Sequence, residues 1–220
     1  MTMPVRLIRW GLANSVLAST AFLCAGSFRR PGLGRYLLVY AVSDFASTIM
    51  ISPALASERS RPLADGVDPA VRPLASLLFI TTVALGALDV GRIHLTFSFS
   101  KGAQLAALAV FIAGRALQIW AMSVNVFFST ELRIQPESGH RLIEHGPYHC
   151  IRHPGYLAML LIVPSTAVAL GSSLALLPAV MYAALILFRV RREDRYLFRN
   201  LPGYANYIDR APYRLIPGIW

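Results

Sequence analysis

The residues best suited to chemistry lie in one polar stretch, Gly139–Tyr156, directly before a long apolar run. Pro147 and Pro154 each remove a backbone donor and disfavour helix just before them, so the stretch is expected to form an irregular loop. Pro154 also suits the first turn of the helix that follows, whose free N–H groups lie beside Arg152 and His153. A helix start next to an arginine favours binding of a carboxylate or a phosphate.

Tyrosine rings in the same loop add flat surfaces with a polar tip. Tyr148 and Tyr156 offer faces that suit an adenine ring or a cation. The alternative is an interfacial belt, because Arg, His and Tyr all favour the headgroup level of a membrane. For the stretch as a whole, two prolines that fix its shape favour a binding site over such a belt.

His145, His149 and His153 recur every four residues and raise the question of a metal site. Helical spacing would place the three imidazoles on one face, but Pro147 interrupts such a helix. The HExxH pattern of a helical zinc site is absent. We therefore expect no metal in this loop.

A second charged group follows the last apolar run, where Glu193 and Asp194 stand among several arginines. A solvated helix end is one interpretation of this group. In the other, Glu193 points back toward Arg152, where it orients that arginine or accepts hydrogen bonds from a bound cofactor.

The composition places these groups on a membrane protein. Hydrophobic residues make up 55% of the 220-residue chain and charged residues only 15%, whereas a soluble domain carries about 25% charged residues. The net charge of +10 does not indicate nucleic-acid binding, because the basic residues cluster at the ends of apolar runs. Arg6 and Arg9 before the first run resemble a signal peptide, but the many later runs favour a retained first helix.

Apolar runs of about 20 residues can cross a membrane as helices, and they predict an all-α bundle of five to six spans. The runs are Trp10–Phe28, Tyr36–Ala56, Leu74–Val90, Gly102–Phe128, Tyr156–Leu170 and Leu174–Val190. Only a tight turn fits between the last two, so residues 155–190 are expected to form a helical hairpin. We divide the chain into N-terminal transmembrane helices, 1–124, and a region that carries the chemistry, 125–220. Asp44 and Arg115 fall inside predicted spans, where an ionisable group carries function or pairs across helices.

The arginines also predict the orientation of the bundle. With six spans and a cytoplasmic N-terminus, most of them fall on the cytoplasmic side, as the positive-inside rule requires. Arg29, Arg30 and Arg35 in the first loop are exceptions. The polar loop before the hairpin and the chain after it then emerge on the same side, so their residues can meet.

At this point the pattern resembles a known family, the isoprenylcysteine carboxyl methyltransferases. The residues that carry the resemblance are Gly146-Pro147-Tyr148, Arg152-His153-Pro154, Tyr156, the Arg-Arg-Glu-Asp helix after the hairpin, Tyr204, Tyr207 and Arg214–Pro217. They span roughly Asn125–Trp220. The resemblance implies a membrane-embedded methyltransferase that uses S-adenosylmethionine, with its site on the cytoplasmic face and a lipophilic acceptor arriving from the bilayer.

By matching position, the resemblance also assigns residues. The cofactor pocket would be lined by His145, Gly146, Pro147, Tyr148, His153, Pro154, Tyr156, Tyr204 and Tyr207. Arg152 and Glu193 would be the polar pair closest to the reacting centre. His149 stands where the family usually has Arg or Lys, and the acidic pair is Glu-Asp rather than Glu-Glu. The acceptor group, whether carboxylate, amine or thiol, therefore stays open.

Two other functions remain as alternatives. One is an NADPH-dependent membrane reductase of the sterol-reductase-like type, which has a related hairpin and basic–aromatic loop. The other is a non-catalytic membrane protein or small transporter, in which Asp44 and Arg115 line a path and the basic loop binds anionic lipid. Binding of S-adenosylhomocysteine or of NADPH to the purified protein distinguishes the three.

Overall fold

A computed structural model describes residues 1–27, 30–60 and 67–220. These residues form helices joined by short connections, and the β-type contact found among them is an isolated bridge between Ser98 and Ser172. The α-helices are α1 (Met3–Ala25), α2 (Pro31–Met50), α3 (Pro53–Glu58), α4 (Val71–Leu88), α5 (Lys101–Val124), α6 (Pro154–Leu170), α7 (Leu176–Asn200) and α8 (Tyr204–Arg210). A π-helix, η1 (Asp89–Ile93), extends α4, and two 3-10 helices are η2 (Pro136–Ser138) and η3 (Gly146–His149). The all-α prediction is confirmed.

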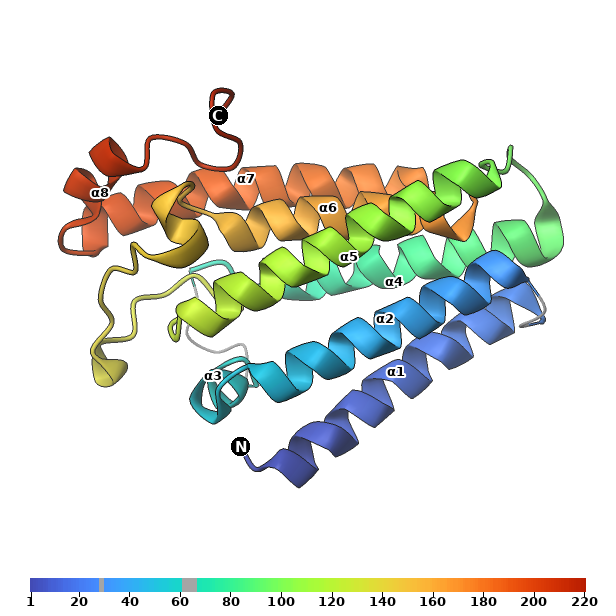
Figure 1. Ribbon diagram of the computed structural model, residues 1–220, viewed down its shortest axis with the longest axis horizontal. Coiled ribbons are helices and arrows are strands. Elements are labelled where there is room, and N and C mark those ends of the chain that lie inside the picture. Colours follow the sequence, from blue (N-terminus) through green and yellow to red (C-terminus); the bar gives the residue numbers. More distant parts are fainter. Residues whose placement is uncertain (28–29, 61–66) are drawn as a thin grey trace.

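The long helices run back and forth along one axis (Figure 1). Helix α5 packs along α6, α4 packs against α7 and α1, and α2 contacts both α1 and α5. One end of the bundle holds α3, the 125–153 loop and α8, and the other holds the α4–α5 connection and the α6–α7 turn (Figure 1). Helices α6 and α7 form the predicted hairpin, and the segments before and after it lie at the same end.

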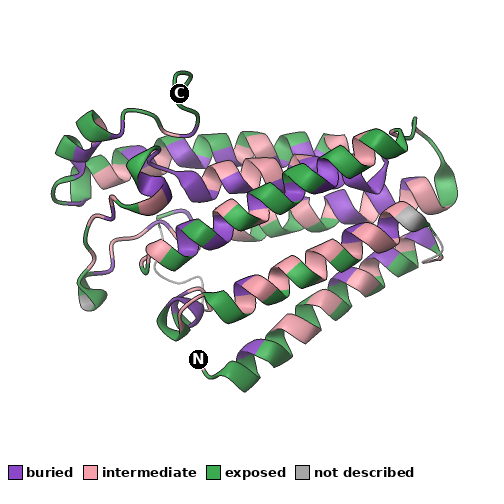
Figure 2. Cartoon of the chain, in the orientation of Figure 1, coloured by how far each residue is buried: buried purple, intermediate pink, exposed green. Residues whose placement is uncertain are grey.

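Several helices have the length and surface that a bilayer requires. Met3–Ala25, Val71–Ile93 and Lys101–Val124 are long and apolar enough to cross a membrane, and α6 is a shorter apolar helix. Large apolar side chains such as Leu12 and Ile112 are more than half exposed, on helices whose outer faces are coloured as exposed in Figure 2. Because lipid tails are as apolar as these side chains, the outer faces of the helices do not have to be buried in protein. These features define an integral membrane protein.

The predicted run Tyr36–Ala56 is wrong as a single helix, because the chain breaks between α2 and α3. Helix α2 ends at Met50, and Pro53 occupies the first turn of α3. The Ser52 hydroxyl caps α3 by accepting the Leu55 N–H at 3.1 Å. An N-cap serine followed by proline is a strong local helix start, which a search for apolar length does not detect.

The second helix of the hairpin is longer than its predicted run. Helix α7 continues past Val190 to Asn200, because Arg, Glu and Leu favour helix whether or not they are in lipid. Three residues used in the predictions, Phe28 at the end of the first run and Arg29 and Arg61 in the orientation, lie outside the described residues.

The two ionisable residues inside predicted spans pair across helices. Arg115 of α5 donates from NH2 to Asp44 Oδ1 of α2 at 3.0 Å, and from NH1 to Gln118 Oε1 at 2.7 Å. Asn14 of α1 donates to the other oxygen of Asp44 at 3.1 Å. This polar cluster joins three helices and gives each charge a partner, as an apolar surrounding requires.

A second polar cluster closes the end of the bundle opposite α8. Asp89, in η1, accepts hydrogen bonds from the Leu95 N–H at 2.9 Å, the Thr96 N–H at 3.2 Å and the Thr96 hydroxyl at 2.6 Å. The Ser172 hydroxyl donates to the same carboxylate at 2.6 Å. The carboxylate therefore connects the α4–α5 segment to the α6–α7 turn. This contact fixes the position of the hairpin along the axis of α4.

Candidate functional site

A cavity of about 320 Å³ lies at the end of the bundle that holds the loop and α8. Its walls come from α4, the 125–143 segment, the start of α6, one face of α7, and α8. The residues of the predicted site that line it are Tyr148, Arg152, His153, Tyr156, Glu193, Tyr204 and Tyr207. A volume of about 300–1,000 Å³ is typical of sites for small molecules. The structure thus brings most of the predicted residues to one cavity.

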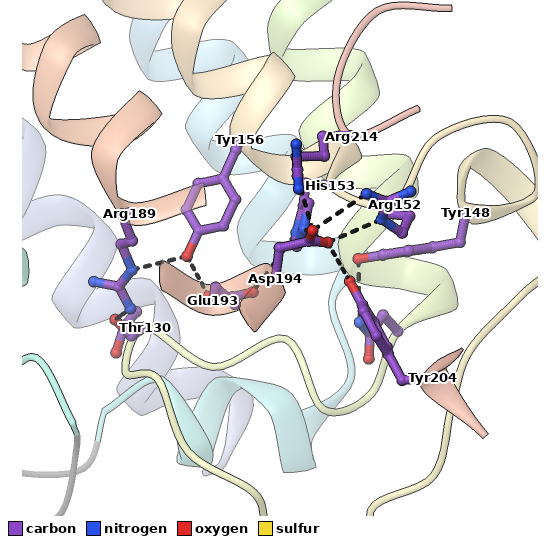
Figure 3. Close-up of polar contacts among 11 residues, drawn as sticks. Thr130, Tyr148, Arg152, His153, Tyr156, Arg189, Glu193, Asp194, Tyr204 and Arg214 are labelled. Carbon is purple, nitrogen blue, oxygen red and sulfur yellow. Dashed lines mark hydrogen bonds and ion pairs between the residues drawn. The ribbon is translucent and has the colours of Figure 1, made fainter. Parts of the chain in front are cut away.

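Arg152 is held by a carboxylate of its own chain. Its Nε donates to Asp194 Oδ1 at 2.9 Å and its NH2 donates to Asp194 Oδ2 at 3.2 Å, while NH1 donates to the Ala211 carbonyl at 2.7 Å (Figure 3). The side chains of Arg152 and Asp194 are only 3% and 5% exposed. The expected contact between Arg152 and Glu193 is therefore wrong. Asp194 takes that place, and it occupies the anion site that the loop was expected to offer to a ligand.

Three further donors converge on Asp194. Tyr204 OH donates to Oδ1 at 2.8 Å, Arg214 Nε donates to Oδ2 at 2.8 Å, and His153 Nε2 lies 3.1 Å from Oδ1. Burial raises the pKa of the Asp194 carboxyl, but hydrogen bonds from His153, Arg152 and Arg214 more than offset this and hold the pKa well below its usual range. A permanently ionised Asp194 thus ties the loop, α7, α8 and the tail together.

The backbone strengthens the same junction. The Arg152 N–H donates to the Tyr213 carbonyl at 3.0 Å, and the His153 N–H donates to the Arg214 carbonyl at 2.9 Å. The chain after α8 therefore runs beside the start of α6. The N–H groups of Arg152 and His153, just before the first turn of α6, are thus satisfied by this tail.

Glu193 points to the cavity side of the same helix. Its Oε2 accepts a hydrogen bond from Tyr156 OH at 2.5 Å, and its side chain is 22% exposed (Figure 3). Arg189 Nε donates to the Tyr156 oxygen at 2.8 Å, and Arg189 NH2 donates to the Thr130 carbonyl at 2.7 Å. The other oxygen, Oε1, lies 3.9 Å from His153 Nδ1. A partly exposed carboxylate in this position can accept a hydrogen bond or a proton from a ligand.

Three tyrosines form the part of the wall nearest α8. Tyr207 OH donates to the Tyr148 carbonyl at 2.6 Å, and Asn125 Nδ2 donates to Tyr148 OH at 3.1 Å. The rings of Tyr204 and Tyr207 meet edge to face with centroids 5.7 Å apart. Burial raises the pKa of all three phenols above the usual value, so they stay neutral and present uncharged rings.

Four residues of the predicted pocket shape the loop and do not line the cavity. Gly146 has a φ of +62°, and a Cβ there would lie 3.0 Å from Val124, so the turn into η3 favours glycine. Pro147 is buried in η3, and Pro154 occupies the first turn of α6 as predicted. His145 is exposed to solvent. Within residues 1–27, 30–60 and 67–220 no three His, Cys, Asp or Glu side chains are grouped as a metal site.

Asp194, Arg189 and Arg214 hold the site together, and the sequence analysis assigned none of them a role there. The buried residues of α7 include Ile186, Arg189, Val190 and Asp194, which recur at helical spacing. That spacing places Asp194, and not Glu193, on the buried face. This spacing of buried positions is present in the sequence. It indicates the orientation of Asp194 only if α7 is assumed to continue past the end of the apolar run.

The fold and the site define a class: an all-α membrane protein in which a polar loop, a terminal helical hairpin and a tail enclose a cavity at one end. Residues 107–199 match the model of the isoprenylcysteine carboxyl methyltransferase (ICMT) family. The match covers most of α5, the loop, α6 and nearly all of α7, and it confirms the resemblance predicted from the sequence.

Two curated relatives share part of the chain. The cobalt-zinc-cadmium resistance protein CzcN of Cupriavidus metallidurans is 36% identical over 86 residues. The nickel-cobalt-cadmium resistance protein NccN of Alcaligenes xylosoxydans xylosoxydans is 34% identical over 86 residues. Each comparison covers 37% of this chain and only 38% of the relative's length.

Proposed function

We propose that this protein is an integral membrane methyltransferase that transfers a methyl group from S-adenosylmethionine to a lipophilic or small acceptor. The observation that carries the proposal is the cavity, which is enclosed largely by the segment that matches the methyltransferase family. Both relatives are named for metal resistance, and their names leave the acceptor of this chain open.

The lining of the cavity fits the proposed cofactor. S-adenosylmethionine carries an adenine ring, hydroxyl groups and a sulfonium cation. Neutral rings of Tyr148, Tyr204 and Tyr207 offer faces for the adenine and the cation. The Glu193 carboxylate offers an acceptor for a hydroxyl group or a counter-charge for the sulfonium. Tyr156 and His153 complete the wall beside it, while His145, Gly146, Pro147 and Pro154 give the loop its shape.

The chemistry asks little of the protein beyond alignment and exclusion of water. The bound cofactor supplies an electrophilic methyl group on a positively charged sulfur. Asp194 and Arg152 hold the loop and tail closed against α7, which keeps the cavity dry. Tyr156, fixed by Arg189, aims the Glu193 carboxylate into the cavity. A carboxylate acceptor needs no base, whereas an amine or thiol gives up a proton, for which Glu193 is the acceptor.

The proposal includes the topology. Helices α1, α2, α4, α5, α6 and α7 would give five to six spans, with the N-terminus, the loop and the tail on the cytoplasmic face. The basic residues at the end that holds the loop support this orientation. A lipophilic acceptor and membrane lipid are then the expected partners, and no nucleic acid is expected.

Calorimetry on the protein purified in an uncharged detergent tests the proposal. S-adenosylhomocysteine should bind saturably to the wild type and to Arg195→Gln, a control on the same helix whose Nε donates to the Arg191 carbonyl. Glu193→Gln should bind about tenfold more weakly, since a hydrogen bond to a charged group contributes about 1.5–3 kcal/mol.

Binding of NADPH alone would replace the proposal with a reductase, and binding of neither compound would favour a non-catalytic protein. Transfer of label from S-adenosylmethionine to a component of a membrane extract would then identify the acceptor. Because the label reports the product directly, a wild type that binds S-adenosylhomocysteine but labels nothing would contradict the proposed activity.

A further inference from the structure

The cavity wall is rich in arginine, and most of these guanidinium groups are already engaged within the chain. The arginines that line it are Arg59, Arg72, Arg133, Arg141, Arg152 and Arg189. Arg133 donates to Glu58 at 3.1 and 2.8 Å, and Arg72 lies 3.9 Å from Glu131. Arg141 is exposed to solvent. Arg152 and Arg189 are held by Asp194 and by Tyr156, as described above.

Arg59 differs from these residues. Its guanidinium lies over the Phe128 ring, with Cζ 5.4 Å from the ring centroid. Its NH1 atom is buried and has no hydrogen-bond partner among the described residues. Burial, together with the charges of Arg72 and Arg115, lowers the pKa of Arg59 to about 10, so the side chain is still charged at neutral pH. A guanidinium with a buried N–H group that lacks a partner is unfavourable, and a bound anion would offset that cost.

Phe128 contacts both Arg59 and the start of α6, and so places Arg59 beside the rest of the site. Phe128 lies directly against the backbone of Gly155, where a Cβ would come within 2.3 Å of the ring. Gly155 immediately precedes Tyr156, which donates to Glu193. Arg59 and the start of α6 therefore lie against the same aromatic ring.

An apolar wall continues from this point into the bundle. Ala75 and Phe79 of α4, Met159 of α6, and Ile186 of α7 line the same cavity. Phe128 itself adds an apolar face next to the cation. The cavity thus combines a guanidinium whose buried NH1 lacks a partner among the described residues with a surface suited to a hydrocarbon chain.

We propose that Arg59 binds the anionic group, a carboxylate or a phosphate, of a lipophilic acceptor whose chain lies along this apolar wall. The proposal rests on the proposed function and deepens it by naming the acceptor class. The proposal assigns the anionic group to recognition, and another group of the acceptor receives the methyl group. Arg59 lies outside residues 107–199, so the family match assigns it no role.

Binding of matched amphiphiles to the full chain in an uncharged detergent tests the proposal. The probes are hexadecyl phosphate, hexadecanoate, hexadecanol and inorganic phosphate. The two anionic amphiphiles should bind the wild type at least about tenfold more tightly than hexadecanol, and this preference should disappear in Arg59→Gln. Arg59→Lys should retain part of the preference, and Arg195→Gln should retain all of it. S-adenosylhomocysteine affinity, measured on the same samples, should be unchanged in Arg59→Gln.

Each other result counts against the proposal. Equal affinity of the wild type for hexadecyl phosphate and hexadecanol, or a preference that survives in Arg59→Gln, would overturn it. Inorganic phosphate binding as tightly as hexadecyl phosphate would assign a free anion instead of an amphiphile. Loss of S-adenosylhomocysteine affinity in Arg59→Gln would assign the subsite to the cofactor.

The chemistry of the product tests the recognition role separately. The labelled acceptor from a membrane extract should keep its label in mild base, because N-methyl and S-methyl groups are stable there, and release of labelled methanol would show that the anionic group itself is methylated. Failure of the wild type to bind S-adenosylhomocysteine would instead refute the proposed function, and the probe preferences would remain measurable.

Discussion

The substitution Asp194→Asn should destabilise the protein severely, although the new side chain has almost the same size and shape. Asp194 is 5% exposed and accepts from Arg152, Arg214 and Tyr204. An amide keeps one acceptor oxygen and turns an NH2 group toward these donors, so the buried Arg152 charge loses its partner. Breaking a buried pair on one side costs about 3–5 kcal/mol. For a chain of this length that is a decrease of about 6–20 °C in the unfolding midpoint.

Thermal unfolding in detergent, followed by tryptophan fluorescence, measures this decrease. The matched control is Glu193→Gln on the neighbouring residue, whose side chain is 22% exposed and whose amide oxygen can still accept from Tyr156. The control should lose no more than about 1 kcal/mol. If both variants unfold within a few degrees of each other, the assignment of Asp194 as the residue that holds the loop, α8 and tail together is wrong.

The pH dependence gives a second measurement on the same pair of proteins. The pKa of Asp194 in the folded protein lies below the unfolded value of about 3.9. Its carboxylate therefore stabilises the fold at pH values above about 4, and this contribution is lost as the pH falls through the folded pKa. The difference in midpoint between wild type and Asp194→Asn should be constant from pH 7 to about pH 5 and should shrink below pH 4. A difference that does not change with pH would contradict an ionised Asp194.

Three further substitutions test other parts of the structure. Gly155→Ala places a methyl group against Phe128, which should cost about 1–3 kcal/mol and weaken S-adenosylhomocysteine binding by calorimetry; unchanged affinity would show that the contact can relax freely. Asp44→Asn removes the partner of Arg115 within the predicted spans and should lower the unfolding midpoint by an amount worth about 1–3 kcal/mol, while Asn14→Ala, which spares the charge pair, should do much less. Asp89→Asn weakens the cluster at the far end of the bundle and should cost about 2 kcal/mol without changing S-adenosylhomocysteine affinity; a change in affinity would reveal coupling along the hairpin.

Local signals in the sequence predicted the parts of the site that depend on local structure. Pro154 at a helix start, a glycine-containing turn after Leu170 and the apolar runs on both sides were enough to predict the α6–α7 hairpin. The hairpin topology then brings the loop and tail to the same end, so their residues can meet. These inferences needed only periodicity and turn chemistry. The grouping of Tyr148, Tyr156 and Glu193 in one pocket was implied by the resemblance to the methyltransferase family.

The parts that were not predicted depend on the rotation of a helix or on contacts distant in sequence. Choosing between Glu193 and Asp194 as the partner of Arg152 requires the phase of α7, which follows from buried positions beyond the apolar run. Arg59 enters the cavity only because the end of α3 lies beside Phe128, and nothing near Arg59 in the sequence indicates that contact. Tertiary packing decided both cases.

The adjacent carboxylates on α7 differ in role because successive residues on a helix point about 100° apart. Asp194 faces the buried junction and Glu193 faces the cavity. A single residue inserted into or deleted from α7 between the hairpin turn and Glu193 would rotate both side chains away from these positions at once. A length change in the stretch of α7 between Leu176 and Glu193 is therefore expected to disrupt the junction and the cavity together.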